Sequence, residues 1–232
     1  MSAAIHPIRP VTVGLVEGEH LDQPEFHRRY EAMPLGVRAE LIDGVVYMPG
    51  PVSWDHGKNH FSMILSLGQY IEQTPGIEGL DNATAILGRR SEPQPDVSLI
   101  IRPECGGQTR IEDGFIHGAP ELIVEIAKAS RYIDLGPKLA EYQRAAVQEY
   151  IVRAFEPDEL ILFRLNEGTL RRVSADDDGI YRSVAFPGLW LDAQGLLSSD
   201  SGQLRRVIDL GLASPEHAGF VARLGANRSA RP

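Results

Sequence analysis

The spacing of apolar and polar positions along the chain predicts a mixture of helices and strands. Apolar residues recur at helical intervals over residues 22–33, 55–73 and 203–212, and a Gly-Pro pair opens another helix over 137–146. Strand-like runs occupy 37–48 (with a turn at Asp43-Gly44), 84–88, 97–101, 122–127, 150–155, 160–165, 171–173 and 181–183. Strands outnumber helices, so we expect an α/β domain, an α+β mixed sheet flanked by helices.

Length and the composition of the two ends predict one domain with appendages. The chain has 232 residues, against about 150 for a typical domain. Residues 1–20 have no sustained period and are expected to be loosely ordered, whereas 21–198 would form the domain. Residues 199–232 would be a C-terminal extension whose small, polar and basic last residues are disordered. The acidic run 176–179 predicts a hairpin turn between the two strands beside it.

Charge and cysteine content exclude several classes of protein. The formal net charge of −9 argues against a protein that coats polyanions generically. The single cysteine, Cys105, excludes a disulfide framework within the chain. No apolar run approaches the roughly 20 residues that cross a bilayer, and no signal peptide opens the chain, so we expect a cytoplasmic protein without a membrane partner. Lysine is scarce, since Lys58, Lys128 and Lys138 stand against twenty arginines.

Two acidic residues belong to strands that are otherwise apolar. Glu125 lies within the run 122–126, where an unpaired carboxylate would cost several kcal/mol. Asp96 follows Pro95 and opens the strand over 97–101. If the two strands are neighbours, the carboxylates can meet, and paired oxygen ligands suit Mg²⁺ or Mn²⁺. The alternative is that Glu125 faces solvent or pairs with an arginine.

Glu40 and Lys138 complete the candidate site. Glu40 also lies among apolar residues, and Lys138 begins the helix after the strand that carries Glu125. A lysine at such a site can orient the attacking water and offset developing charge. The alternative is an ordinary helix residue that pairs with Glu141 or Asp134.

Two histidines have the spacing of a zinc pair. His56 and His60 are four residues apart on one helix, but Gly57 replaces the glutamate of the hydrolase motif. We therefore interpret both as histidines with ordinary partners, and the alternative is that His56 lines the active cleft. Cys105, in a glycine-rich segment, is interpreted as an incidental loop thiol.

At these residues the chain resembles the PD-(D/E)XK nuclease superfamily and, more closely, the Uma-type restriction endonuclease family. The stretches that carry the resemblance are 39–46, His56-Gly57, 95–97, 118–126, 134–142 and 147–152. Together they extend over roughly residues 20–190. The resemblance implies a restriction-endonuclease-like core over 21–198 and a metal-dependent phosphodiesterase, with Asp96 and Glu125 as metal ligands and Glu40 as an assisting acid.

The expected position of the lysine departs from the superfamily pattern. The superfamily carries it two residues after the acid, on the same strand face, and here that residue is Ala127. Lys128 would point to the opposite face unless a bulge intervenes. We therefore assign the role to Lys138 and keep Lys128 as its rival, because residues 127–130 also differ from the family's usual Leu-Ser-Pro-Ser.

The resulting hypothesis is a Mg²⁺- or Mn²⁺-dependent endonuclease that cleaves DNA by a metal-activated water. The other expected cleft residues are His56, Lys128, Gln94 and Tyr142. A basic rim near the carboxylates is predicted from Arg89, Arg90, Arg131, Arg144 and Arg153, and their placement on remote faces would count heavily against DNA. A homodimer would suit cleavage of both strands. The alternatives are a catalytically inactive nucleic-acid-binding or assembly protein of the same fold, and a metal-dependent phosphoesterase for another phosphoester.

Overall fold

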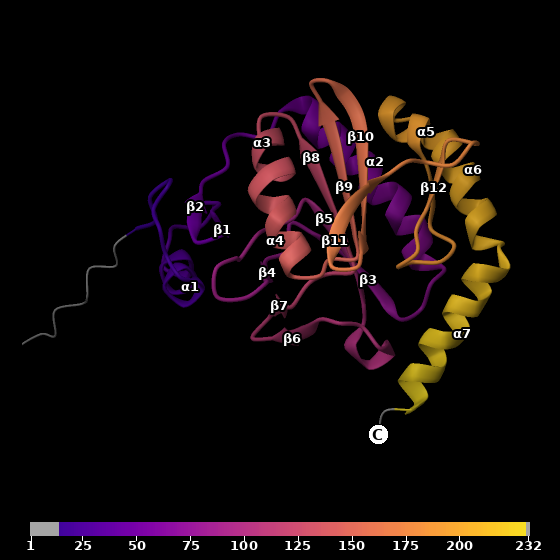
Figure 1. Ribbon diagram of the computed structural model, residues 1–232, viewed down its shortest axis with the longest axis horizontal. Helices are drawn as coiled ribbons and strands as arrows, with labels where there is room; N and C mark the ends of the chain where they lie inside the picture. The colour runs from indigo at the N-terminus through magenta and orange to yellow at the C-terminus, as the bar shows by residue number, and fades with distance from the viewer. Residues whose placement is uncertain (1–13, 231–232) are drawn as a thin grey trace, which may run out of the picture.

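A six-stranded mixed sheet forms the centre of the molecule in the computed structural model, which describes residues 14–230 (Figure 1). Its strand order is β11-β10-β9-β8-β5-β3, in which β8 and β9 run parallel and the other neighbours antiparallel. The strands are β3 (Ile77–Asp81), β5 (Val97–Ile101), β8 (Leu122–Ala127), β9 (Glu149–Phe155), β10 (Asp158–Asn166) and β11 (Thr169–Val173).

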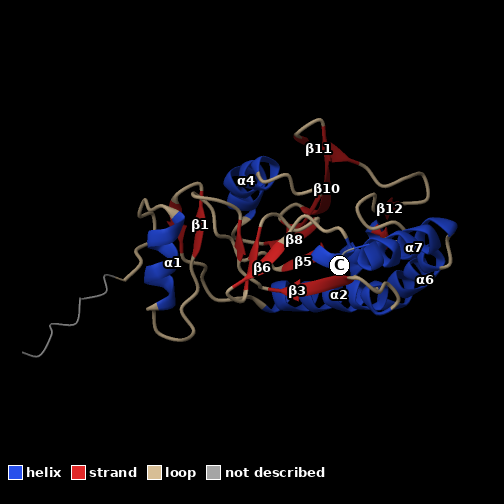
Figure 2. Ribbon diagram, turned by 90° about the horizontal axis from the view of Figure 1, so that it is seen from below, coloured by secondary structure: helices blue, strands red, loops and turns tan. Residues whose placement is uncertain are grey.

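Helices cover both faces of this sheet (Figure 2). One face packs against α2 (Trp54–Glu72), α5 (Ala193–Ser198), α6 (Ser201–Leu212) and α7 (Pro215–Ala230). The other face packs against a continuous helical segment made of α3 (Arg131–Ile133), a π-helical turn η2 (Asp134–Lys138) and α4 (Leu139–Arg144). Side chains alternate along β8, so Val124 faces α2 whereas Ile123 and Ala127 face α4. Glu125 therefore points toward the α3–α4 side.

A small layer at one end of the sheet carries the N-terminal part of the described chain. It contains α1 (Gln23–Glu31), the hairpin of β1 (Glu40–Ile42) and β2 (Val45–Tyr47), and the small sheet of β4 (Ala85–Ile86), β6 (Arg110–Glu112) and β7 (Phe115–His117). Its apolar cluster is Leu15, Phe26, Ala39, Leu41 and Val46. Backbone hydrogen bonds between Leu41 and Glu92 join the hairpin to the rest of the molecule and place Glu40 beside the main sheet.

The predicted pairing around the acidic turn is wrong. The strand over 171–173 pairs with β10 as part of β11, whereas β12 (Ile180–Arg182) pairs with β13 (Trp190–Asp192). The Asp176 carboxylate accepts the N–H groups of Asp178 and Ile180, which shapes a capped loop instead of a hairpin. Tyr181 is then buried in the cluster on the α2 side of the sheet.

The chain ends also differ from expectation. Residues 225–230 continue α7, because Phe220 and Leu224 are buried and Asn227 donates a hydrogen bond to the carbonyl of Cys105. Gly18 donates to the carbonyl of Val46, so the later part of the 1–20 segment pairs with β2, while residues 1–13 lie outside the described residues. The division at residues 21–198 stays a prediction. Within 14–230, no helix is long and apolar enough to cross a membrane.

The helix expected over 137–146 begins earlier. Its first turn starts at Arg131, and Ser130 bonds to Asp134 through both its carbonyl and its hydroxyl. Pro137 lies inside the segment and has no N–H, so one helical hydrogen bond is missing where the backbone widens into η2. This longer helical segment therefore lies close to the end of β8.

Candidate active site

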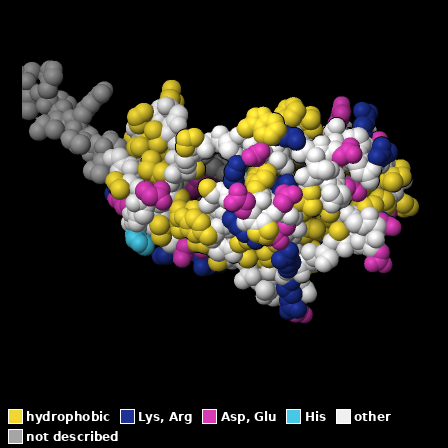
Figure 3. All heavy atoms as spheres, turned by 90° about the horizontal axis from the view of Figure 1, so that it is seen from above, with side chains coloured by type: hydrophobic (Ala, Val, Ile, Leu, Met, Phe, Trp, Pro, Cys, Tyr) yellow, Lys and Arg dark blue, Asp and Glu magenta, His cyan; other side chains and the backbone are white. Residues whose placement is uncertain are grey.

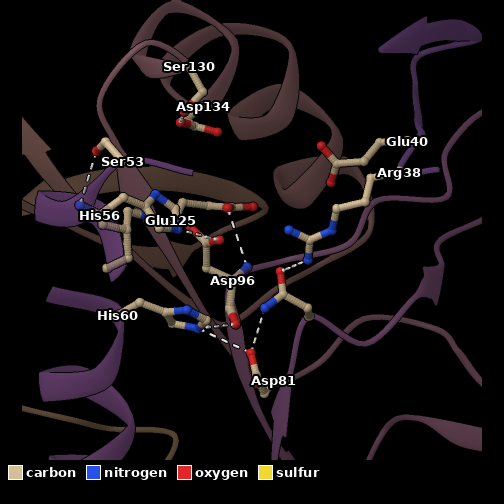
Figure 4. Close-up of polar contacts among 12 residues, drawn as sticks. Arg38, Glu40, Ser53, His56, His60, Asp81, Asp96, Glu125, Ser130 and Asp134 are labelled. Carbon is tan, nitrogen blue, oxygen red and sulfur yellow. Dashed lines mark hydrogen bonds and ion pairs between the residues drawn. The ribbon is translucent and has the colours of Figure 1, made fainter. Parts of the chain in front are cut away.

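Asp96 and Glu125 meet where β5 begins beside the later part of β8, two interior strands of the sheet. Strands β5 and β8 are antiparallel neighbours with Val97 opposite Val124, so the condition under which the two acids can meet is fulfilled. The N–H of Ile126 donates to Asp96 Oδ2 at 2.7 Å, and the N–H of Asp96 lies 3.4 Å from Glu125 Oε2. The two carboxylates are therefore side by side, as Figure 4 shows.

Lys138 lies among the carboxylates. Its Nζ is 2.9 Å from Glu125 Oε1, 3.0 Å from Glu40 Oε1 and 3.8 Å from Asp134 Oδ1. The residue is only 5% exposed. The helical segment after β8 thus brings Lys138 to the face of the strand that carries Glu125, and the four predicted residues Glu40, Asp96, Glu125 and Lys138 converge.

Lys128, the rival, lies elsewhere. Ala127 is fully buried on the face shared with Glu125, and no bulge turns Lys128 to that face. Lys128 lines the cavity described below, but its Nζ forms an exposed ion pair with Asp55 of α2 at 2.7 Å. The structure brings Lys138, and not Lys128, to the carboxylates.

The cluster holds more carboxylates than ammonium groups. Burial raises the pKa of Glu125 well above its ordinary value, an effect that Lys138 partly offsets. Burial likewise raises the pKa of Asp134 to about 6. Burial alone would lower the pKa of Lys138, but Glu125, Glu40 and Asp134 raise it well above its ordinary value, so the ammonium stays charged. An excess of buried carboxylates of this kind favours the binding of a cation.

Two of the expected cleft residues hold the carboxylates in place. The buried hydroxyl of Tyr142 donates to Glu125 Oε1 at 2.7 Å. The backbone N–H of Gln94 donates to Glu40 Oε1 at 2.6 Å, and the Gln94 amide donates to the Tyr30 hydroxyl. Tyr142 and Gln94 therefore each fix the orientation of one carboxylate.

The histidines contact Asp96. His56 Nε2 lies 3.3 Å from Asp96 Oδ1, so His56 is at the cleft, which was the alternative interpretation. Burial lowers the pKa of His56, but the hydrogen bond and charge of Asp96 outweigh it and raise the pKa. His60 Nε2 lies 2.8 Å from the Asp96 carbonyl and 3.2 Å from Asp81. One donor atom from each of His56, His60 and Asp96 lies within 4.8 Å of the others, a spacing that could also hold a metal.

A cavity of about 450 Å³ opens above these residues. Glu40, Asp96, Glu125, Asp134 and Lys138 line it together with the loop over 48–53, His56 of α2, and Tyr132 and Ile133 of α3. The space-filling view in Figure 3 shows a hollow in the surface with hydrophobic side chains along its borders.

The predicted basic rim is wrong. None of the five arginines lines the cavity, because each pairs with an acid elsewhere: Arg89 with Asp22, Arg90 with Asp43, Arg131 with Glu159, Arg144 with Glu141 and Arg153 with Asp158. Arg38 lines the cavity instead and donates to Asn82. Arg38 was not predicted, although it is two residues before Glu40. Asp134 was predicted only as an ordinary helix partner of Lys138, and the structure places it in the cluster, 3.8 Å from Lys138.

The chain matches known proteins in family and in fold. A family model described as "Uma2: Putative restriction endonuclease" matches residues 23–194. A solved structure described as "a putative nuclease belonging to DUF820" from Anabaena variabilis aligns at a TM-score of 0.59 with 15% identity, over 74% of this chain and 96% of that one. No curated protein compared with the chain matches it. The expected fold class, a mixed sheet flanked by helices with a restriction-endonuclease-like core, is confirmed.

Proposed function

The chain belongs to the Uma2 family, and on that premise we propose that it is a nuclease that uses Mg²⁺ or Mn²⁺ to hydrolyse phosphodiester bonds of DNA. The observation that carries the proposal is the convergence of Asp96 and Glu125 from two strands with Lys138 from a helix, at the base of one cavity. Such a cluster costs folding energy, which is typical of a functional site.

The donor atoms fit a divalent metal ion. Among the described residues, Asp96 Oδ1 has His56 as its close polar partner, and Glu125 Oε2 has the 3.4 Å backbone contact of Asp96. Both oxygens therefore keep lone pairs available. Mg²⁺ and Mn²⁺ prefer carboxylate oxygens and retain waters beside them. When held by Asp96 and Glu125, such an ion would offset charge on the phosphate and lower the pKa of a water.

The protein's own groups supply the positioning. Glu125 and Glu40 hold the ammonium of Lys138 between them, so that its charge lies at the floor of the cavity. There it can orient a water and stabilise the charge that develops on the phosphate. Tyr142 and the backbone of Gln94 fix the two carboxylates that hold the lysine.

The form of the DNA is constrained by charge. Affinity for duplex DNA comes largely from Lys and Arg contacts to phosphates, and the predicted arginine rim is not at the cavity. The absence of these five arginines from the cavity lining counts against DNA, and most strongly against the duplex. The homodimer expected for cleavage of both strands stays a prediction, which size-exclusion chromatography with light scattering checks.

A cleavage assay tests the proposal. The full chain is freed of metal with EDTA and then incubated with fluorescent single-stranded and duplex DNA, with or without Mg²⁺ or Mn²⁺. We expect metal-dependent cleavage that Asp96→Asn and Glu125→Gln abolish. Asp177→Asn, in an exposed acidic loop, is the matched control and should keep full activity.

Calorimetry separates the alternatives. The catalytically inactive alternative predicts neither metal binding nor cleavage. It is excluded if the wild type cleaves DNA and binds Mn²⁺, and if Asp96→Asn loses that binding. Full metal-dependent cleavage by both Asp96→Asn and Glu125→Gln would show that the site assignment is wrong. Cleavage of a small phosphodiester such as bis(p-nitrophenyl) phosphate without cleavage of DNA would favour a different phosphoester substrate.

A further inference from the structure

The mouth of the cavity is aromatic and apolar. Its edge is formed by Tyr47 at the end of β2, the segment Met48–Val52, and Tyr132 in α3, which we call the aromatic lip. Tyr132 is 72% exposed and Val52 is 57% exposed. Exposed apolar side chains gathered around a concave site are typical of a surface that a ligand covers.

The two tyrosines come from opposite sides of the mouth. Tyr47 belongs to the N-terminal hairpin, and Tyr132 belongs to the helical segment that follows β8. Both side chains line the same cavity, and burial raises the pKa of Tyr47. Two aromatic rings on either side of an opening can contact the faces of a flat ring.

The cavity offers few cations to a polyanion. Besides Lys138 and His56, its basic lining residues are Arg38 and Lys128. Arg38 donates to the neutral side chain of Asn82 and so keeps its charge for a ligand, whereas Lys128 pairs with the carboxylate of Asp55. A ligand of this mouth would therefore have Arg38 for a phosphate contact, and would gain further affinity from contacts with the rings.

We propose that the aromatic lip binds an unpaired nucleobase, while the adjoining phosphate lies at Asp96, Glu125 and Lys138. This inference rests on the proposed nuclease function and names the form of its substrate, a single-stranded or locally unpaired DNA rather than a duplex. A cavity of about 450 Å³ is in the range that holds a ligand of nucleotide size. Stacking on aromatic rings accepts any base, because each base has a flat face.

Binding to three probes tests the lip. The probes are a fluorescein-labelled oligothymidylate with cleavage-resistant phosphorothioate linkages, the same strand annealed to its complement, and an abasic strand with equal phosphates. Fluorescence anisotropy is measured with the full chain in Mg²⁺. We expect the single strand to bind about tenfold or more tightly than the duplex or the abasic strand, since stacking contributes about 1–3 kcal/mol per base.

Variants assign the preference to the lip. Tyr132→Ala should weaken binding of the single strand by about 5- to 100-fold and leave the abasic strand unaffected, while Tyr132→Phe keeps the ring and the affinity. Phe61→Ala is the matched control, because Phe61 is 64% exposed on α2 but does not line the cavity. Circular dichroism confirms that each variant is folded.

Several outcomes would overturn the inference. Equal or tighter binding of the duplex, equal binding of the abasic strand, no binding of any probe, or an unchanged affinity in Tyr132→Ala each contradict it. The nuclease proposal is judged separately, because these probes resist cleavage. If the protein prefers strands with bases but cleaves no ordinary DNA, only the nuclease proposal is refuted. If it cleaves duplex DNA at a rate that Tyr132→Ala does not change, only the proposal for the aromatic lip is refuted.

Discussion

Lys138→Met tests whether the buried ammonium of Lys138 stabilises the folded protein by compensating the buried carboxylates around it. Lys138 is 5% exposed and lies 2.9 Å from Glu125 and 3.0 Å from Glu40. Removal of one partner from a buried ion pair costs about 3–5 kcal/mol, because the remaining charge is uncompensated. We expect Lys138→Met to lower the free energy of unfolding by about that amount near pH 8. Lys128→Met is the matched control. The side chains of Lys128 and Asp55 are 40% and 46% exposed, and such an exposed ion pair contributes about 0–1 kcal/mol to the free energy of unfolding.

The loss should depend on pH in a defined direction. Burial raises the pKa of Asp134 to about 6 even though Lys138 lowers it, so the pKa rises further without the lysine. Because this folded pKa lies above the unfolded value, ionisation favours the unfolded chain. The stability from this group is fully present below about pH 4 and is lost as the pH rises through about 6. Glu125, whose pKa burial also raises, acts in the same direction. The difference between wild type and Lys138→Met is therefore smallest near pH 4.

Urea denaturation followed by circular dichroism, in EDTA and at several pH values, measures these free energies. The reasoning is refuted if Lys128→Met costs as much as Lys138→Met. It is equally refuted if the cost of Lys138→Met is the same near pH 4 and near pH 8, because a purely steric effect of methionine would not follow the carboxylates.

Single substitutions at Tyr142, Leu224 and His56 test three other parts of the structure. Tyr142→Phe removes the hydrogen bond to Glu125 without changing the packing, and should cost about 1–3 kcal/mol in urea denaturation, with lowered cleavage activity. Leu224→Ala opens a cavity under α7 and should cost about 2–5 kcal/mol, so a loss below about 0.5 kcal/mol in the same assay would show that α7 is not part of the core. His56→Ala removes the nitrogen beside Asp96 and should weaken Mn²⁺ binding more than Mg²⁺ binding in calorimetry, because Mg²⁺ prefers oxygen ligands; an equal loss for both ions would contradict this.

Apolar patterns along the chain made the central elements predictable. The predicted helix over 55–73 is α2 (Trp54–Glu72), and the predicted strand over 122–127 is β8. The buried apolar positions of α2 lie on one face, whereas β8 is an apolar run interrupted only by Glu125 and is buried on both faces. Whether Asp96 and Glu125 meet could be stated only as a condition, because a strand's neighbours are set by contacts between distant segments.

Elements that depend on distant partners were not predictable in the same way. The helix α7 buries His217, Phe220 and Leu224 at helical spacing, but small and polar residues separate them and dilute the pattern. The arginines expected at the cleft were assigned by type, and their position depends on acids that the fold brings near. Arg131 reaches Glu159 of β10, 28 residues along the chain.

The position of the lysine shows which feature of the nuclease motif the chemistry requires. A search for an acid followed two residues later by lysine fails here, because that position is Ala127, whose small side chain is buried in the apolar cluster below α4. What the site needs is an ammonium on the same side of β8 as Glu125. Strand alternation alone excluded Lys128 from that side, and the helical segment with its π turn at Asp134–Lys138 supplies the ammonium from above. The face of the strand, and not the spacing along it, is therefore the property that a sequence search for related sites should keep.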